Sequence, residues 1–272
     1  MNSSSNIFFP KDLFIRSLVK CIWRSHERDV IKRYETILPK GNAEIIFNLC
    51  GNISYFGSTA DNKQAFPKCI INGVNDSPFN LVKEGEQVFL GIQLNVYALK
   101  YLFNIPVKEF NNNVIDGKLV CKKLDDLWYQ ISNEFSFEKQ TMLVLKWVYE
   151  KLAASKHFID LNPILHLHSK LHLNEFTVKS LRSEYNYSER HVRRLFNNWF
   201  GMNVESFIQY KKYLKALHLI HQSTLNLTQI ACDSGYYDQS HFIREFKSLT
   251  NMTPKHYQQR MSGLLGHIYY SI

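Results

Sequence analysis

The chain has 272 residues, 45% hydrophobic and 21% charged, which indicates a globular protein of one large or two ordinary domains. Its net charge of +9 suits a polyanionic partner, although an acidic membrane surface or simple solubility would fit equally well. Five scattered cysteines without a C-x-x-C pair argue against a disulfide framework or a thiolate zinc site, and the absence of a secretion signal or a membrane-length apolar run predicts a cytoplasmic protein without a membrane partner.

Residues 1 to about 95 have the pattern of β-strands. AEIIFNL and ISYF, separated by Cys50-Gly51-Asn52, predict a hairpin. EQVFLGIQLN predicts a half-buried strand, since its apolar residues alternate along one face: Val88, Leu90, Ile92 and Leu94. Several such strands at short spacing favour a small β-barrel or sandwich.

Helical periodicity follows the strands. VYALKYLF, before Pro106, predicts a short helix, and two amphipathic helices come next. The apolar stripe of the first is Leu124, Leu127, Trp128 and Ile131, and that of the second is Met142, Leu145, Tyr149 and Leu152. These helices either cap the β-rich domain or form a dimer contact, and the sequence does not separate the two.

The segment SKHFIDLNPILHLHSKLHL, residues 155–173, contains a proline and four histidines and marks the predicted domain boundary. We expect a β-rich domain with its own C-terminal helices at 1–157, a helical domain at 158–262 and a tail at 263–272. His166, His168 and His172 lack a cysteine or carboxylate cluster that would complete four zinc ligands, so we predict exposed histidines and no metal site.

Residues 176–259 read as helical and repeat at an offset of 50 positions. The matched pairs are His191 with His241, Arg194 with Arg244, Phe196 with Phe246 and Met202 with Met252. A shorter helix and a turn precede each unit. The sequence therefore predicts a helix, a tight turn and a helix, present twice.

The second helix of each unit is predicted to have one face in the core and one polar face. In the first, Val192, Leu195, Phe196 and Trp199 lie inward, and Arg190, Arg193, Arg194 and Asn197 lie outward. In the second, Phe242, Phe246 and Leu249 lie inward, and Ser240, Arg244 and Lys247 lie outward. Ser188 and Asp238 are the predicted N-caps. A helix that enters the DNA major groove needs this division, whereas a single such face is more often only solvated.

Two stretches resemble the AraC family of bacterial transcription regulators. They are SERHVRRLFNNWFGMNVESFIQYKKYLKALHLI and IACDSGYYDQSHFIREFKSLTNMTPKHY, within residues 172 to 260. The resemblance implies a seven-helix domain whose two recognition helices lie in successive major grooves. Arg182 and Asn186 depart from the family pattern in the first scaffold helix and its turn; asparagine tolerates the left-handed conformation that the usual glycine adopts there.

The resemblance also implies which residues contact DNA. Its base-contacting places fall on Arg190, Arg193, Arg194, Gln239, Ser240, His241 and Arg244. His191, Asn197 and Lys247 are assigned mainly to phosphates, and Ser188 completes the predicted DNA-binding set. The residues predicted to serve only the core are Phe196, Trp199, Phe207, Ile230, Ala231 and Phe246.

The N-terminal part is similar, through LPKGNAEIIFNLCGN with its Gly41 and Glu44, to β-rich sensor domains of the same family. Such a domain holds an effector or mediates self-association. Its aromatic residues, which include Trp23, Phe47, Tyr55, Phe56 and Phe89, line a pocket or fill the core. The first 156 residues contain one histidine, His26, and no nucleotide or hydrolase fingerprint, so we expect no catalytic residue, metal or cofactor.

These patterns together predict an α+β protein: a cytoplasmic bacterial transcription regulator that is not an enzyme. Promoter DNA is the expected partner, and a small-molecule effector, RNA polymerase and a second copy of the chain are further candidates. One alternative makes the N-terminal domain a ligand-independent interaction module. A third hypothesis is an enzyme with an accessory nucleic-acid domain.

Overall fold

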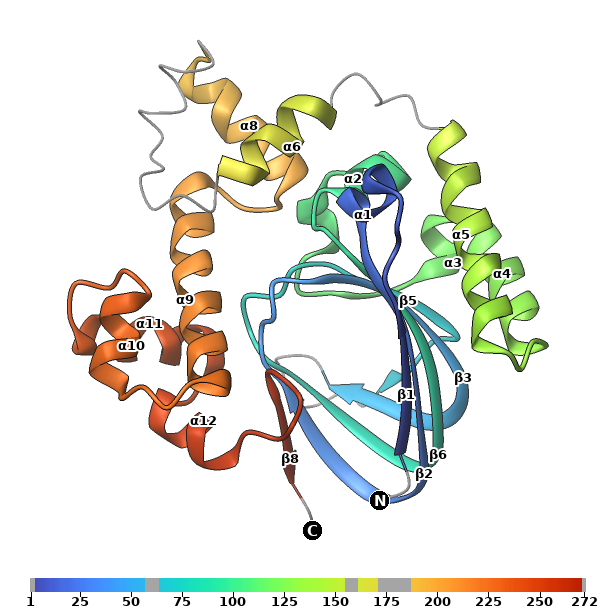
Figure 1. Ribbon diagram of the computed structural model, residues 1–272, viewed down its shortest axis with the longest axis horizontal. Helices are drawn as coiled ribbons and strands as arrows, with labels where there is room; N and C mark the ends of the chain where they lie inside the picture. The colour runs from blue at the N-terminus through green and yellow to red at the C-terminus, as the bar shows by residue number, and fades with distance from the viewer. Residues whose placement is uncertain (1–2, 57–63, 155–160, 171–186, 271–272) are drawn as a thin grey trace.

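The computed structural model describes residues 3–56, 64–154, 161–170 and 187–270, in which one antiparallel sheet is followed by a helical region (Figure 1). The sheet has the order β1-β2-β6-β3-β5-β7, with β4 beside β3 and β8 beside β2. Its strands are β1 (Ser3–Phe8), β2 (Val19–Ile37), β3 (Ala43–Phe56), β4 (Gln64–Ala65), β5 (Cys69–Asn72), β6 (Phe79–Leu94), β7 (Val114–Asp116) and β8 (His267–Tyr270). The predicted α+β class is confirmed.

The hairpin predicted around Cys50-Gly51-Asn52 is wrong, because β3 runs through these residues without reversing. It pairs with β6 on both sides of them, and the register shifts between Asn48 and Cys50 and again between Cys50 and Asn52. Gly51 has a φ of +120°, which glycine adopts far more readily than other residues. A glycine-centred irregularity therefore bends one long strand at the place where the sequence suggested a turn.

Strand β6 is buried on both faces, so its predicted half-burial is also wrong. Leu90, Ile92 and Leu94 are fully buried in the main core, as the alternation indicates. Phe89, on the other face, is only 6% exposed and packs in a second, smaller apolar cluster with Ile53. One face of β6 therefore packs in the main core, and the other face packs in the smaller cluster inside the curve of the sheet.

The helices fall into two groups, one packed beside the sheet and one in the helical region that follows it (Figure 1). Beside the sheet lie α1 (Leu13–Leu18), α2 (Ala98–Phe103), the 3-10 helix η1 (Val107–Phe110), α3 (Gly117–Val120), α4 (Lys123–Ser132) and α5 (Phe137–Ala154). The helical region contains α6 (Leu161–Lys170), α8 (Glu189–Trp199), α9 (Val204–Gln222), α10 (Leu227–Asp233), α11 (Gln239–Thr250) and α12 (Pro254–Arg260). The short helix before Pro106 and the helix from Leu124 to Ile131 are confirmed as α2 and α4.

Helix α5 buries a different face from the predicted one. Met142 and Tyr149 are 67% and 52% exposed, while Thr141, Val144 and Val148 are buried. The helix has apolar residues on several sides, so the stripe chosen from spacing was only one of the faces available. Of the predicted stripe, Leu145 and Leu152 are partly buried against the main core, and only Met142 and Tyr149 are exposed.

The helical region is fastened to the sheet by side-chain hydrogen bonds from α9. The Tyr213 hydroxyl donates to the carbonyl oxygen of Pro39 at 3.0 Å. The Tyr210 hydroxyl donates to the carbonyl oxygen of Asn75 at 2.7 Å and accepts from the Gly41 amide at 3.1 Å. Both tyrosines are buried, so α9 and the loops at the edge of the sheet share one core.

The end of the chain returns to the sheet. Strand β8 pairs antiparallel with β2, with Tyr34 opposite Tyr270 and Ile37 opposite His267. Figure 1 shows β8 leaving α12 and lying along the sheet. The segment 263–272, expected as a tail, thus supplies a strand to the N-terminal sheet.

Candidate functional site

Helix α8 is anchored by one face and capped at its start. The Ser188 hydroxyl accepts a hydrogen bond from the His191 amide at 3.2 Å, which confirms Ser188 as the N-cap. Val192 and Phe196 are almost completely buried, and Trp199 is 8% exposed. These buried side chains fix the rotation of the helix about its axis, and so determine which side chains lie on its outer face.

The outer face of α8 is cationic. Arg190, Arg193 and Arg194 are exposed, and His191 and Asn197 are partly buried. Arg193 Nη2 forms an ion pair with Glu189 Oε1 at 2.6 Å, one turn earlier. An exposed pair of this kind contributes little stability, so Arg193 can exchange Glu189 for another anion at small cost. Arg194 Nη2 lies 3.5 Å from His191 Nδ1.

Helix α11 repeats this arrangement. The Asp238 carboxylate accepts from the His241 amide at 2.7 Å and caps the helix, as predicted. Phe242 and Phe246 are fully buried, and the Phe246 ring lies 5.5 Å from the ring of Tyr213 on α9. The position of α11 is therefore set by the same long helix whose tyrosines hold the edge of the sheet.

The outer face of α11 has fewer cations than that of α8. Ser240, Arg244 and Lys247 are exposed, and Gln239 and His241 are partly buried. Gln239 Oε1 accepts from the Thr228 hydroxyl at 2.9 Å, and His241 Nε2 lies 4.0 Å from Glu245 Oε1. The predicted DNA-binding residues of the first unit thus lie along the outer face of α8, and those of the second unit lie along the outer face of α11.

The turn between α10 and α11 has the expected chemistry. Asn226 and Gln229 form a reciprocal capping box at the start of α10. The turn after α10 contains Gly235, whose φ of +81° most other residues adopt only with strain. Helix, tight turn and helix are therefore all present in the second unit.

The first unit is described only in part. Its scaffold helix and turn, with Arg182 and Asn186, lie outside the described residues, as does His172. The residues predicted to be only core are all buried in the structure: Phe196, Trp199, Phe207, Ile230, Ala231 and Phe246.

One exposed aromatic near α11 escaped the sequence reasoning. Tyr237 is 94% exposed in the turn that leads into α11, whereas its neighbour Tyr236 is 6% exposed. The tyrosine pair in GYYD is the available signal, although the sequence does not say which of the two rings is exposed. Tyr237 therefore adds an aromatic ring and a hydroxyl beside the N-terminus of α11.

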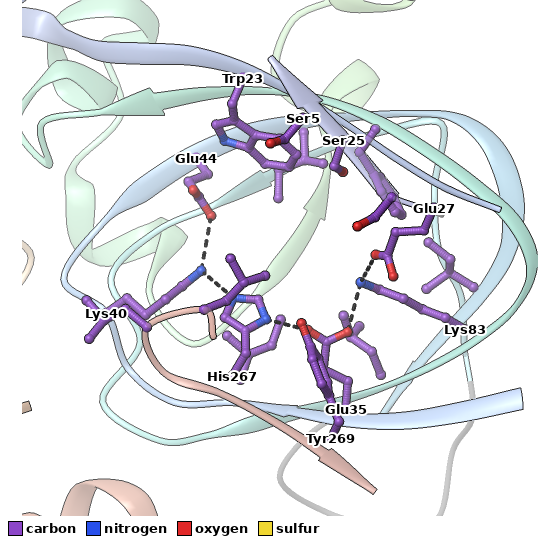
Figure 2. Close-up of a pocket in the computed structure, with 18 of the residues that line it drawn as sticks. Ser5, Trp23, Ser25, Glu27, Glu35, Lys40, Glu44, Lys83, His267 and Tyr269 are labelled. Carbon is purple, nitrogen blue, oxygen red and sulfur yellow. Dashed lines mark hydrogen bonds and ion pairs between the residues drawn. The ribbon is translucent and has the colours of Figure 1, made fainter. Parts of the chain in front are cut away.

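A second candidate site lies inside the sheet. A cavity of about 1230 Å³ is lined by residues of β1, β2, β3, β6, α9 and β8 (Figure 2). Its apolar wall includes Ile37, Ile46, Ile53, Phe66, Leu81 and Phe89. Of the aromatic residues proposed from sequence, Trp23 and Phe89 line this cavity, while Phe47 is buried in the main core. Glu44, from the sensor-like stretch, also lines it.

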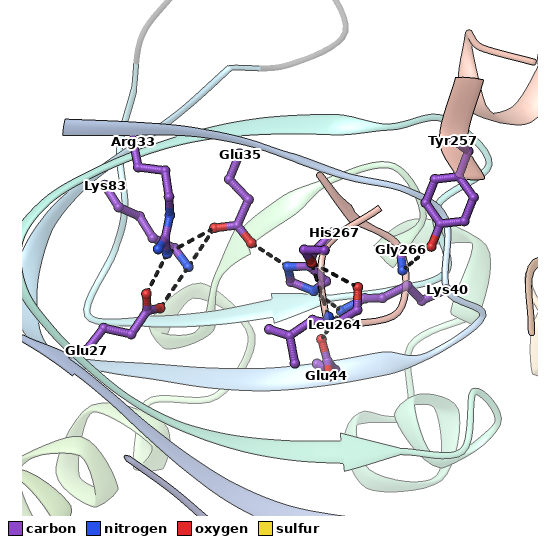
Figure 3. Close-up of polar contacts among 11 residues, drawn as sticks. Glu27, Arg33, Glu35, Lys40, Glu44, Lys83, Tyr257, Leu264, Gly266 and His267 are labelled. Carbon is purple, nitrogen blue, oxygen red and sulfur yellow. Dashed lines mark hydrogen bonds and ion pairs between the residues drawn. The ribbon is translucent and has the colours of Figure 1, made fainter. Parts of the chain in front are cut away.

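A linked row of charged side chains lines part of the cavity (Figure 3). Arg33 Nη2 lies 2.6 Å from Glu27 Oε2, and Lys83 Nζ lies 2.8 Å from Glu35 Oε2. Glu35 is 1% exposed, although it stands among the polar residues of a strand that reads as solvent-facing. The sequence reasoning missed this group, because alternation along a strand does not tell an outer face from an interior one.

His267 joins the C-terminal strand to this group. Its Nδ1 donates to Glu35, and its Nε2 accepts from Lys40 Nζ at 3.1 Å. Burial, and then the charge of Lys40, lowers the pKa of His267, which favours this neutral tautomer. Burial alone would raise the pKa of Glu35, but the hydrogen bond from His267 and the charge of Lys83 outweigh it and hold that pKa well below its usual range.

The described residues contain no group of three or more histidines, cysteines or carboxylates placed to hold a metal ion. His166 is exposed on α6. The His168 ring instead packs against Tyr97, with ring centroids 5.1 Å apart, and stacks on Phe200 at 6.5 Å. Within the described chain, no helix is both long and apolar enough to cross a membrane.

Known proteins match both parts of the chain. A family described as a helix-turn-helix domain matches residues 181–260, and one described as a domain of unknown function (DUF6597) matches residues 10–116. The HTH-type transcriptional activator RhaR of Cronobacter sakazakii is 29% identical over 91 residues, 34% of this chain and 32% of that protein. The HTH-type transcriptional regulator ExsA of Pseudomonas aeruginosa is 24% identical over 141 residues, 52% of this chain and 48% of that protein.

The matched segments thus span less than half of the length of these two curated relatives. Among solved structures, ToxT from Vibrio cholerae is 12% identical, with 96% of this chain and 99% of that chain covered and a TM-score of 0.48.

Capped, anchored helices with polar outer faces and a helix-turn-helix match over 181–260 define the class of the C-terminal part: a helix-turn-helix DNA-binding domain. Within that class the domain is of the AraC type, as the two quoted stretches imply. The relatives that match this part of the chain are named as HTH-type transcriptional regulators.

Proposed function

We propose that the protein regulates transcription by binding promoter DNA sequence-specifically, with α8 and α11 as its two recognition helices. The observation that carries this proposal is the repeated construction of the two helices. Each has a side-chain cap, an aromatic anchor in the core and exposed cations on its outer face. Duplex DNA is the partner that such a pair of helices fits, because long donor-rich side chains reach both base edges and phosphates.

The proposed base-reading residues are Arg190, Arg193 and Arg194 on α8, and Gln239, Ser240, His241 and Arg244 on α11. The proposed phosphate-binding residues are His191, Asn197 and Lys247, and Ser188 contributes at the start of α8. Exposure of the five cations supports this assignment. Because Gln239 Oε1 already accepts from Thr228, its amide nitrogen is the group that it offers to DNA.

The N-terminal part is proposed to bind a small-molecule effector in the cavity inside the sheet. The size and mixed lining of the cavity support this role. The exposed stripe on α5, with Met142 and Tyr149, favours the second candidate, in which the N-terminal part contacts another protein such as a second copy of the chain or RNA polymerase. Either regulator acts where bacterial promoters are, in the cytoplasm, and neither requires catalysis.

Selection of bound sequences from a pool of random duplexes tests this proposal. The full chain is used at near-physiological salt, because phosphate binding alone dominates at low salt. We expect one asymmetric site with two preferred blocks about one helical turn apart. Retention that is salt-sensitive but blind to sequence would contradict base reading by α8 and α11.

A further inference from the structure

The cavity is closed by residues from the two ends of the chain. Trp23, Glu35 and Lys83 come from the N-terminal sheet, while His267 and Tyr269 come from β8, which follows the DNA-binding domain (Figure 2). The Tyr269 ring lies 4.5 Å from the Arg33 guanidinium carbon, and His267 is hydrogen-bonded to Glu35. Strand β8 therefore forms a wall of the cavity next to the linked row of charged side chains.

The charges of this linked group balance one another; Arg33, Glu35, Glu44 and Lys83 are buried, and Glu27 and Lys40 are partly buried. Glu27, Glu35 and Glu44 are the anions, and Arg33, Lys40 and Lys83 are the cations. His267 Nε2 lies 3.1 Å from the Lys40 ammonium nitrogen, which can only donate, so this ring nitrogen carries no proton and the ring is neutral. Burial lowers the pKa of His267 in the same direction. Each of these ions already has an opposite charge within 4.0 Å. A ligand with a net charge would lose its hydration without finding an unmatched counter-charge, which is costly in a buried site.

The other charges that line the cavity do not change this balance. Arg28, Asp29 and Lys32 also line the cavity, and all three are exposed. Arg24 lines it as well, and its guanidinium donates to the carbonyl oxygen of Phe135 at 2.9 Å in an exposed hydrogen bond. Water and salt screen such groups much more than buried ones. Selection by charge is therefore made at the inner, balanced group.

One donor of this group still needs an acceptor. Arg33 is 8% exposed, and its Nε has no hydrogen-bond partner among the described residues, although Nη2 is paired with Glu27. An unpaired buried donor is unfavourable, and an uncharged oxygen satisfies it without upsetting the balance of charge. The remaining lining, with Ile53, Leu81 and Phe89, suits an apolar body.

We propose that the cavity binds an uncharged small molecule with an apolar body and an acceptor oxygen, and that β8 is the wall against which its polar end lies. This inference rests on the proposed effector-binding role of the cavity. Arg33 Nε donates to the oxygen of the ligand, and Tyr269 covers the Arg33 guanidinium from the side of β8. The DNA-binding end of the chain thereby supplies part of the effector site.

Two fluorescent probes with the same ring system test the charge preference on the full-length protein. They are 8-anilinonaphthalene-1-sulfonamide, which is uncharged and keeps acceptor oxygens, and 8-anilinonaphthalene-1-sulfonate, which is an anion. Binding that survives in Ile53→Trp, which fills the apolar end of the cavity, is counted as surface binding and subtracted. We expect the uncharged probe to bind about tenfold more tightly, equivalent to about 1.4 kcal/mol. Equal or tighter binding of the sulfonate would overturn the preference for an uncharged ligand.

Charge variants sharpen this test, because the ratio of the two affinities does not depend on the fraction of folded protein. Glu35→Gln leaves a net positive group and should shift the ratio toward the sulfonate. Lys83→Met leaves a net negative group and should shift it toward the uncharged probe. An unchanged ratio in both variants would show that this group does not contact the ligand.

The role of β8 is tested with Tyr269→Ala and a matched control, Thr36→Val. Thr36 lies opposite Ile268 in the same β2–β8 pairing but does not line the cavity. Tyr269→Ala should weaken the uncharged probe about tenfold, the range of one lost aromatic contact, and Thr36→Val should not. Equal affinities in the two variants would remove β8 from the site, and no cavity binding in the wild type would overturn the site itself. These titrations contain no DNA. A failed DNA selection would therefore contradict the proposed regulator function but would not change the result of the titrations.

Discussion

The two recognition helices begin alike but are attached to different parts of the molecule. Helix α8 ends at a turn in which the Gly201 carbonyl accepts a hydrogen bond from Asn111 Nδ2 at 2.8 Å, just after η1. Helix α11 packs through Phe246 on Tyr257 of α12, with ring centroids 6.0 Å apart. The Tyr257 hydroxyl accepts from the Gly266 amide at 3.0 Å, directly before β8.

This difference gives α11 a contact with the residues before β8 that α8 is not seen to make in the described chain. A short series of contacts connects α11 to the cavity, since Gly266 is followed by His267, which is bonded to Glu35 (Figure 3). Helix α8 is instead held at the side of the sheet where η1 lies. We therefore expect a change in the cavity to alter the DNA contacts of α11 before those of α8.

The largest effects should come from the aromatic anchors. Phe196→Ala and Phe246→Ala each remove a fully buried ring, and each should lower the free energy of unfolding by about 3 to 5 kcal/mol. Urea unfolding of the full chain measures both. We expect Phe246→Ala also to speed hydrogen exchange in β8, and Phe196→Ala to leave it unchanged. Equal exchange in β8 for the two variants would remove the distinction between the helices.

Removal of one of the arginines proposed to read bases should cost less binding free energy than loss of an anchor costs in stability. Arg193→Ala and Arg244→Ala should each lose about 1 to 3 kcal/mol on the selected site and relax the base preference there. Fluorescence anisotropy with the selected duplex and with a scrambled duplex measures the difference. Equal losses on the two duplexes would indicate a phosphate contact. Glu189→Gln is the control for α8, because it frees Arg193 from its 2.6 Å ion pair without removing the arginine.

Lys247→Ala should produce a smaller and non-selective loss. Lys247 is exposed in the last turn of α11, where a phosphate contact adds affinity without reading sequence. We expect the plot of log K against log salt to become shallower by about one unit. An unchanged slope would place Lys247 outside the DNA interface.

The smallest expected effect is a pH dependence of stability caused by His267 in β8. Because burial and Lys40 lower the pKa of His267, the folded state resists a proton that the unfolded chain accepts below about pH 6.5. The unfolded state then binds more protons, so stability should fall as pH drops through this range. The free energy of unfolding of His267→Gln, measured with urea at pH 7.5 and 5.5, should fall less between these two values than that of the wild type. Parallel losses in the two proteins would assign the effect to other histidines.

The helical half was predictable because its signals are local. Ser188 and Asp238 cap helices whose apolar spacing identifies the buried face, and Gly235 marks the turn between α10 and α11. On α5 the same reasoning failed, because apolar residues surround the helix and only packing decides that Val144 is buried and Met142 is not.

The interior of the sheet was not predictable for a different reason. Strand β8 is four residues long, and its partner Glu35 lies more than 200 positions earlier, so no local pattern links them. Lys83 and Glu35 read as residues of solvent-facing strand faces, and only the curvature of the sheet turns them inward. Composition and spacing contain no information about that curvature.

Repeating the duplex selection with Arg193→Ala and Arg244→Ala beside the wild type tests most sharply whether α8 and α11 read separate parts of one site. We predict that each variant loses base preference in one block of the site, and that the two blocks differ and lie about one helical turn apart. If both variants relax the same block, or neither changes any preference, then α8 and α11 do not read separate parts of one site.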